Sequence, residues 1–256
     1  MLSNYKANVR DIDNEVLGIV SDRYKIVQNK EAFDFTDLLI GNGVTYETAG
    51  SLRKGKTIWL LVKLPETKIL GDNFAPYICF SNTHDGTSAV KVCMTPIRVV
   101  CSNTLNLALN SATRTWSARH TGNIALKLEE AKETLGLAHK YMTALDKEAD
   151  QLANSSITEE KIHAFVEELF PIKDTDSDRQ KTNIKTIRDN IMVCYFSPDL
   201  IKFAKTKWGV INAVSDWCGH AEPIRNSNDF KANNWGRIMN GHVVMDKAFQ
   251  LLTTKY

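Results

Sequence analysis

The side chains with the most potential for chemistry lie close together near the C-terminus. Asp216 and His220 are four residues apart, Cys218 lies between them, and His242 follows later. Residues four apart share one face of a helix, so this pair could bind a metal ion or exchange a proton. The set matches no metal motif of known spacing, and a histidine at a helix C-terminus also interacts favourably with the helix dipole. We therefore predict a structural role for His220 and no metal site.

Other patterns that would indicate an enzyme are missing from the sequence. It contains no Gly-x-x-x-x-Gly-Lys-Ser/Thr loop, so nucleotide hydrolysis is unsupported. His84 and Asp85 stand where a turn is expected, and turn chemistry is their simplest role. The five cysteines lie in apolar segments without a Cys-x-x-Cys pair, as buried reduced thiols do. No pattern in the sequence identifies a catalytic residue or a cofactor, and a non-enzymatic protein is the favoured interpretation.

Positive charge is concentrated in the middle of the sequence. Residues 50–120 contain nine lysines and arginines against three carboxylates, a net charge of +6, whereas the whole chain carries +2. Cations neutralise phosphates, and aromatic side chains stack on unpaired bases. Two alternatives stay open, because scattered lysines also solubilise a sheet and a tryptophan here could be a packing residue. The residues predicted to bind nucleic acid are Arg53, Lys54, Lys56, Arg98, Asn103, Arg114, Trp116 and Arg119.

One stretch of this basic region predicts a strand that runs into a helix. Residues 90–101 are rich in β-branched side chains, and residues 102–104, Ser-Asn-Thr, are good N-cap residues before a leucine-rich segment. The free N–H groups of such a helix N-terminus, beside Arg98, could hold a phosphate. The alternative is an ordinary capped helix with Arg98 solvated or paired with a carboxylate.

The N-terminal half is expected to form an antiparallel sheet built from hairpins. Residues 44–64 read as two strands around a turn at residues 53–56, and a second hairpin turns at Asp85-Gly86. One or two short strands are expected over residues 16–27, followed by a helix over residues 29–40.

The C-terminal half is expected to begin with a long helix over residues 121–154. Its apolar residues recur at alternating steps of four and three, the spacing of a coiled-coil seam. The seam could pack on a second helix over residues 157–170, or part of it could serve another subunit. The residues predicted to contact a second copy are Leu128, Leu135, Met142 and Leu145.

These patterns predict an α+β fold. Residues 1–120 form the antiparallel β-rich region with one early helix, and residues 121–256 form the helical region of the same globular unit. A hydrophobic content of 43% with 24% charged residues is ordinary for a folded protein. No apolar run is long enough to span a bilayer, and the N-terminus lacks the apolar core of a signal peptide, so a cytosolic protein without a membrane partner is expected.

Three phrases of the sequence resemble one known family. They are Leu17-Gly-x-Val-Ser-x-Arg-Tyr-x-Ile-Val-Gln-Asn29, Pro96-x-Arg-Val-Val-Cys-Ser-Asn-Thr-Leu105, and Trp208-Gly-x-x-Asn-Ala-Val-x-Asp-Trp217 with His220 just after it. In this order they resemble the phage- and plasmid-like proteins grouped as domain of unknown function 932. The resemblance implies a mobile genetic element in a bacterial host cell and names no activity. The order of hairpins and helices is similar, in outline only, to single-strand annealing recombinases, which is an analogy of fold.

The favoured hypothesis is a non-enzymatic protein of a phage or plasmid that binds single-stranded DNA in the cytoplasm of the host. It could anneal strands as a homo-oligomer built through the long helix. The alternative is a protein-binding factor, such as an inhibitor of a host anti-phage defence complex, with the helical half as its interface. An enzyme stays open as a third class, because the resemblance names no activity.

Overall fold

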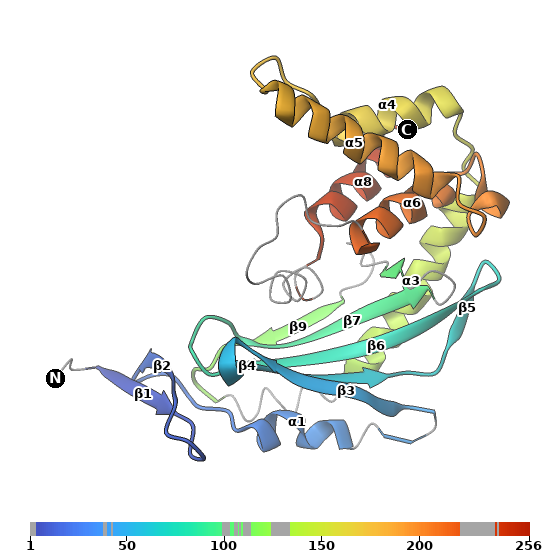
Figure 1. Cartoon of the computed structure of the whole chain (residues 1–256). Coiled ribbons are helices and arrows are strands. Elements are labelled where there is room, and N and C mark those ends of the chain that lie inside the picture. The colour runs from blue at the N-terminus through green and yellow to red at the C-terminus, as the bar shows by residue number, and fades with distance from the viewer. Residues whose placement is uncertain are drawn as a thin grey trace.

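The computed structural model describes residues 4–37, 40–41, 43–98, 103–104, 107, 109, 114–123, 134–220, 239 and 241–256 (Figure 1). The elements in chain order are β1 (Tyr5–Val9), β2 (Val16–Ser21), α1 (Asn29–Asp37), β3 (Thr45–Leu52), η1 (Arg53–Gly55), β4 (Thr57–Lys63), β5 (Thr67–Ile69), β6 (Asp72–Thr83), β7 (Val90–Arg98), β8 (Asn103–Thr104), β9 (Thr115–Ala118), α3 (Thr134–Ala153), α4 (Glu159–Leu169), α5 (Asp178–Tyr195), η3 (Ile201–Phe203), α6 (Lys207–His220) and α8 (Val243–Thr254). This arrangement confirms the α+β fold.

The main sheet has seven antiparallel strands, and β6 and β7 lie at its centre. Its strands follow the order β3-β4-β6-β7-β8, with β5 added to β6 and β9 added to β7. Both predicted hairpins are confirmed, one as β3–β4 and the other as β6–β7. Strands β1, β5 and β9 were not expected, because they are only five, three and four residues long. The chain pairs β1 with β2 in a separate two-stranded sheet.

One face of the main sheet is buried by helices α1 and α3. Phe74, Ile78 and Phe80 alternate along β6 and share a hydrophobic cluster with Ala138 and Leu145 of α3. The Tyr141 hydroxyl of α3 donates a hydrogen bond to the Leu107 carbonyl at 2.8 Å, which satisfies a polar group inside this layer. The apolar residues on this face of β6 therefore pack the long helix against the sheet.

Helix α6 is the centre of the helical half. Eight consecutive residues from Trp208 to Ser215 are buried, as expected of a helix surrounded by other elements. Its neighbours are α3, α5 and α8, and Figure 1 shows α5 and α8 above the sheet, whereas α1 lies below it and α3 runs down behind it. One hydrophobic cluster runs from the sheet through α3 into α6 and α8, so the β-rich and helical regions share a core.

Polar contacts fasten the helices to one another and to the sheet. Lys247 of α8 donates hydrogen bonds to the carbonyls of Glu168 and Leu169, which are unpaired groups at the end of α4. Lys202 pairs with the buried carboxylate of Asp72 at the start of β6. No helix among the described residues is both long and apolar enough to cross a membrane.

The apolar seam of the long helix packs inside the chain, which corrects the prediction of an oligomer contact. Leu145 is 0% exposed and Met142 is buried, and both belong to the core shared with the sheet and α6. Neither side chain is free to meet a second copy. Leu128 lies outside the described residues, as does the side chain of Leu135. The helix was expected to start at residue 121. The described residues 121–123 are not helical, so it starts later.

The expected helix N-terminus at residues 102–104 is wrong. Asn103 and Thr104 form strand β8, which pairs antiparallel with Arg98 and Ile97 of β7. Leu107 and Leu109 are buried but not helical. Because strand pairing uses the backbone N–H groups of this segment, these residues provide no helix terminus for a phosphate.

Candidate nucleic-acid interface

Three chain segments meet at one end of the main sheet and bring basic residues together. The β3–β4 turn leads into Thr57, which pairs with Thr83 at the end of β6, and Val90 at the start of β7 pairs with Ala118. Arg53, Lys54, Lys56 and Arg119 therefore lie at the same end of the sheet, although they are far apart in sequence. The tertiary arrangement thus collects four of the eight predicted residues.

Lys25 joins this end of the sheet through the backbone of His120. The Lys25 N–H donates to the His120 carbonyl at 2.7 Å, and His120 Nδ1 lies 3.1 Å from the Lys25 carbonyl. The strand-end surface is defined here as Lys25, Lys54, Lys56 and Arg119. None of these four cations forms an ion pair within the part of the chain that the structure describes.

The β3–β4 turn holds Lys54 in a strained conformation. Arg53, Lys54 and Gly55 have positive φ angles of 51°, 58° and 88°. Two consecutive non-glycine residues in this region are unusual, and such strain gathers at ligand-binding sites. Glycine suits position 55 because of this positive φ, and a Cβ there would displace the Arg10 guanidinium, since it would lie 2.5 Å from Nη1 of Arg10. That nitrogen donates to the Lys54 carbonyl at 3.0 Å and anchors the turn.

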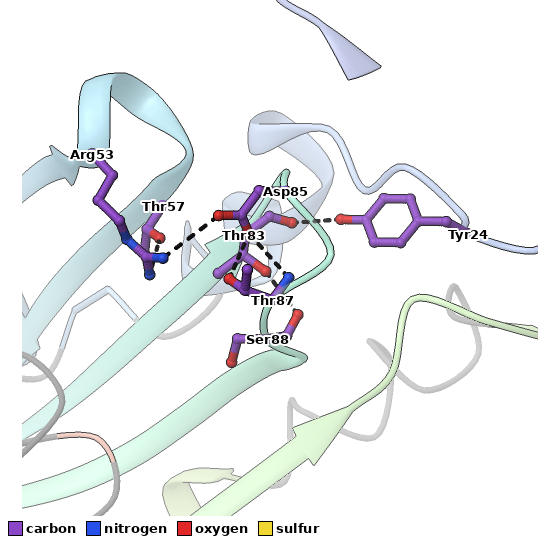
Figure 2. A network of polar contacts seen from close by, with 7 residues as sticks. All are labelled: Tyr24, Arg53, Thr57, Thr83, Asp85, Thr87 and Ser88. Atoms are coloured by element: carbon purple, nitrogen blue, oxygen red, sulfur yellow. Dashed lines mark hydrogen bonds and ion pairs between the residues drawn. The ribbon is translucent and has the colours of Figure 1, made fainter. Parts of the chain in front are cut away.

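Arg53 belongs to the scaffold of this end of the sheet (Figure 2). Its guanidinium lies 3.5 Å from the Asp85 carboxylate and donates to the Thr57 hydroxyl at 3.2 Å. Asp85 in turn accepts from the Thr87 N–H at 3.0 Å and from the Thr87 hydroxyl at 2.6 Å, which confirms the turn role expected of Asp85. Arg53 therefore links the β3–β4 turn to the β6–β7 turn, and part of its charge is already compensated.

Buried polar side chains support the surface from beneath. The Tyr24 hydroxyl donates to the Thr83 carbonyl at 2.5 Å, and burial raises the pKa of Tyr24 (Figure 2). The Tyr24 ring stacks on His120 with ring centroids 4.5 Å apart. His84 is buried, and its Nε2 lies 2.8 Å from the Asn29 side-chain oxygen. This polar layer fixes the segments that carry Lys25 and Arg119.

A cavity of about 300 Å³ opens beside the strained turn. Its polar lining includes the amides of Asn8, Gln28 and Asn29, the His84 imidazole and the charged Arg10 and Asp11, and its apolar lining includes Leu17 and Ile58. Gly55, next to Lys54, forms part of its wall. The volume is at the lower end of small-molecule sites, and the mixture of amides, an imidazole and apolar walls suits a flat polar group such as a nucleobase.

Burial disfavours the protonated form of both histidines of this layer, which predicts a pH effect on stability. Burial lowers the pKa of His84 and of His120, whereas unfolded histidines titrate near about 6.5. Below that pH the unfolded chain binds protons that the folded chain does not, so the free energy of unfolding falls as the pH drops toward the folded-state pKa. We expect urea denaturation to show lower stability at about pH 5.5 than at about pH 7.5.

The variant His84→Gln should reduce this pH dependence, because it removes one of the two groups. The matched control is His163→Gln, at an exposed histidine on α4, which should leave the dependence unchanged. Equal pH dependence in the wild type and in His84→Gln would contradict a role for His84.

The other predicted binding residues do not reach the strand-end surface. Arg114 is half-buried, and its Nη1 donates to the Met94 carbonyl at 3.1 Å and contacts the Cys93 sulfur at 3.5 Å. Trp116 is half-buried against the core, so it is the packing residue that the sequence left as an alternative. Both residues therefore stabilise the sheet.

Arg98 and Asn103 lie at the opposite end of the sheet. They face each other in the register of β7 and β8, and their side chains are outside the described residues. Val90 and Arg98 are the two ends of β7, eight residues or about 26 Å apart. The sequence could not show which of these cations share a face. It also missed Lys25, whose only signal was its position inside the first family-like phrase.

The histidines near the C-terminus hold helix ends. His220 Nδ1 lies 2.7 Å from the Asp216 carboxylate on α6, and the His242 side chain accepts a hydrogen bond from the Val244 N–H at the start of α8. Cys218 approaches His242 at 3.9 Å. Within the described ranges, no group of three potential ligands is placed to hold a metal ion.

Comparisons with known proteins identify a family and no activity. No curated protein and no solved structure matches the chain. A family model described as "Domain of unknown function (DUF932)" matches residues 16–238. This match spans most of the chain, including the turns and strands that form the strand-end surface, so the protein belongs to the family of domain of unknown function 932.

Proposed function

We propose that this protein binds single-stranded DNA at the strand-end surface. The observation that carries the proposal is the gathering at one end of the sheet of four cations that form no ion pair with described residues, Lys25, Lys54, Lys56 and Arg119. Lys54 and Lys56 lie in the turn before β4, and Arg119 directly follows β9. Strands β6 and β7 separate β4 from β9, and neighbouring strands are about 4.8 Å apart, so these cations are spread along the end of the sheet, where one DNA strand would meet them in turn. Neutralising these phosphates releases counterions and stabilises the complex.

The cavity beside Gly55 favours a single strand over a duplex. Its polar lining can accept the hydrogen-bonding edge of one unpaired base, while the phosphates lie on the neighbouring cations. A duplex base would first have to leave its stack and its partner, which costs a few kcal/mol. Trp116 plays no part in this proposal, because its ring packs in the protein.

The proposed setting is a phage or plasmid protein in the cytoplasm of a bacterial host. The family resemblance supports this setting, and annealing of strands would be the corresponding activity. Annealing requires two bound strands to meet, so it also requires that copies of the protein associate.

The test is fluorescence anisotropy of a labelled single-stranded oligonucleotide, titrated with protein at low and at physiological salt. We expect binding that weakens steeply with salt, because phosphate contacts release counterions. Unlabelled single strand should compete, and duplex of the same length should compete poorly.

Absence of binding at low salt would overturn the proposal, and equal competition by duplex would overturn its single-strand part. If the protein binds no DNA, protein binding becomes the leading function, and a pull-down with host proteins would be the next experiment.

A further inference from the structure

Strand β3 forms an open edge of the main sheet. It stands at one end of the strand order, and β4 is its one partner among the described strands (Figure 1). Residues 45–49 and Ser51 are exposed, and Gly50 and Leu52 are half-buried. An open edge presents backbone N–H and C=O groups to which another strand can bind. The backbone of β3 is therefore accessible to a strand from outside the chain.

The hydrogen bonds of β4 establish which residues of β3 face outward. Alternate residues of an antiparallel strand point their backbone groups to opposite sides. The Leu64 N–H donates to a β6 carbonyl at 2.9 Å, so the odd-numbered residues of β4 face β3. Trp59 therefore bonds with its register partner Gly50, and the neighbours Ala49 and Ser51 point their N–H and C=O groups outward. Neither of these two residues has a backbone partner on that side within the described part of the chain.

The C-terminal part of β3 lacks the features that usually protect an open edge. Edge strands commonly carry lysine, proline or a bulge, each of which hinders pairing with a further strand. Residues 48–52, Thr-Ala-Gly-Ser-Leu, contain no charge and no proline, and their register with β4 is regular. The register shift of β3 lies before them, between Tyr46 and Thr48. This segment, residues 48–52, is defined here as the open edge.

The open edge is complementary to itself. A two-fold axis perpendicular to the sheet at Gly50 would pair two copies antiparallel and place Ala49 of one copy opposite Ser51 of the other. The outward donors and acceptors of both residues would then meet. The two Gly50 residues would face each other at the axis, where strands approach most closely, and glycine has no side chain to obstruct that approach.

Two side chains beside the open edge also fit a second copy. The Trp59 ring lies against Gly50, since a Cβ on Gly50 would be 2.8 Å from Trp59 Cζ2, so one indole from each copy would cover the axis. Glu47 is exposed and forms no ion pair with described residues. In the antiparallel arrangement it would lie near Arg53 of the other copy, whose side chain is 41% exposed. Opposite charges therefore favour the antiparallel direction.

We propose that β3 pairs antiparallel with β3 of a second copy, so that two main sheets join into one continuous sheet across a two-fold axis. About four backbone hydrogen bonds form at the join, because Ala49 and Ser51 of each copy exchange both of their groups. One short strand buries little surface, so the dimer is weak and its population depends on the protein concentration. The dimer goes beyond the proposed DNA binding and does not depend on it.

Sedimentation velocity over a range of protein concentrations tests the dimer. Wild-type protein should shift from monomer to dimer as the concentration rises. Ala49→Pro should raise the dissociation constant about tenfold or more, because it removes one outward N–H from each copy and leaves the bonds to β4 intact. Ala49→Lys should have the same effect by placing a charge at the join. The matched control is Val193→Lys, at a residue of α5 that is 71% exposed, and it should dimerise as the wild type does. Circular dichroism confirms that each variant is folded.

Amide hydrogen exchange followed by NMR locates the join. The amides of Ala49 and Ser51 should exchange more slowly at high than at low protein concentration, because only the dimer bonds them. In Ala49→Lys, the Ser51 amide should lose this concentration dependence. Wild-type protein that stays monomeric, assemblies larger than two copies, a folded Ala49→Pro variant that dimerises normally, or exchange at Ala49 and Ser51 that ignores concentration would each overturn the two-fold dimer. These measurements use no DNA, so their outcome is independent of the proposed DNA binding.

Discussion

The triple variant Lys54→Ala, Lys56→Ala, Arg119→Ala is expected to bind single-stranded DNA on the order of ten- to a hundred-fold more weakly than the wild type at low salt. These side chains are three of the four cations of the strand-end surface, and they form no ion pairs with described residues that would break on substitution. Each lost phosphate contact should flatten the plot of log affinity against log salt by about 0.7. The measurement is anisotropy of a labelled strand at several salt concentrations, and the slope should fall by about 2.

A matched variant separates local contacts from net charge. Lys140→Ala, Lys147→Ala and Lys185→Ala remove the same charge from exposed positions on α3 and α5. This control should keep nearly the wild-type affinity and slope, because its residues lie on the helical half. Equal losses in the two triple variants would show that only the overall charge matters, and the strand-end surface would no longer be the binding site.

Leu145→Ala is expected to lower the free energy of unfolding by about 2–5 kcal/mol. The Leu145 side chain is 0% exposed and lies in the cluster that joins the sheet to α3 and α6, so its truncation leaves a cavity that the packed neighbours cannot fill. Urea denaturation followed by circular dichroism measures the loss.

Leu145→Ala should lower the stability of the protein and leave its oligomeric state unchanged. Val193→Ala provides the comparison, because Val193 is an exposed aliphatic residue on α5, and it should change stability by less than about 0.5 kcal/mol. If Leu145→Ala altered the sedimentation behaviour while the free energy of unfolding stayed constant, the residue would contact a second copy and its assignment to the core would be wrong.

Local patterns in the sequence were sufficient for most elements. The turn residues 53–56 and Asp85-Gly86 are short-range signals, and both hairpins formed where they predicted. Helix α1 begins at Asn29 as expected and ends at Asp37, within the predicted range. The switch from strands to helices near residue 120 was likewise visible in the change of apolar spacing.

The same patterns could not predict which elements pack against one another. The seam of α3 has the spacing of a coiled coil, yet the sheet and α6 cover it, because a periodicity states which face is apolar and not what buries it. Asn103 and Thr104 are good N-cap residues, but a strand was available to pair with them, and tertiary pairing overrode the local preference.

The sequence alone determined the α+β class, the hairpins, the helical C-terminal half and the basic centre of the chain. Only the tertiary structure decided that Lys25 joins Lys54, Lys56 and Arg119, and that Arg114 and Trp116 stabilise the sheet. The physical reason is that composition and periodicity record each segment's own preferences, whereas a binding surface depends on strand order and register between segments far apart in the chain.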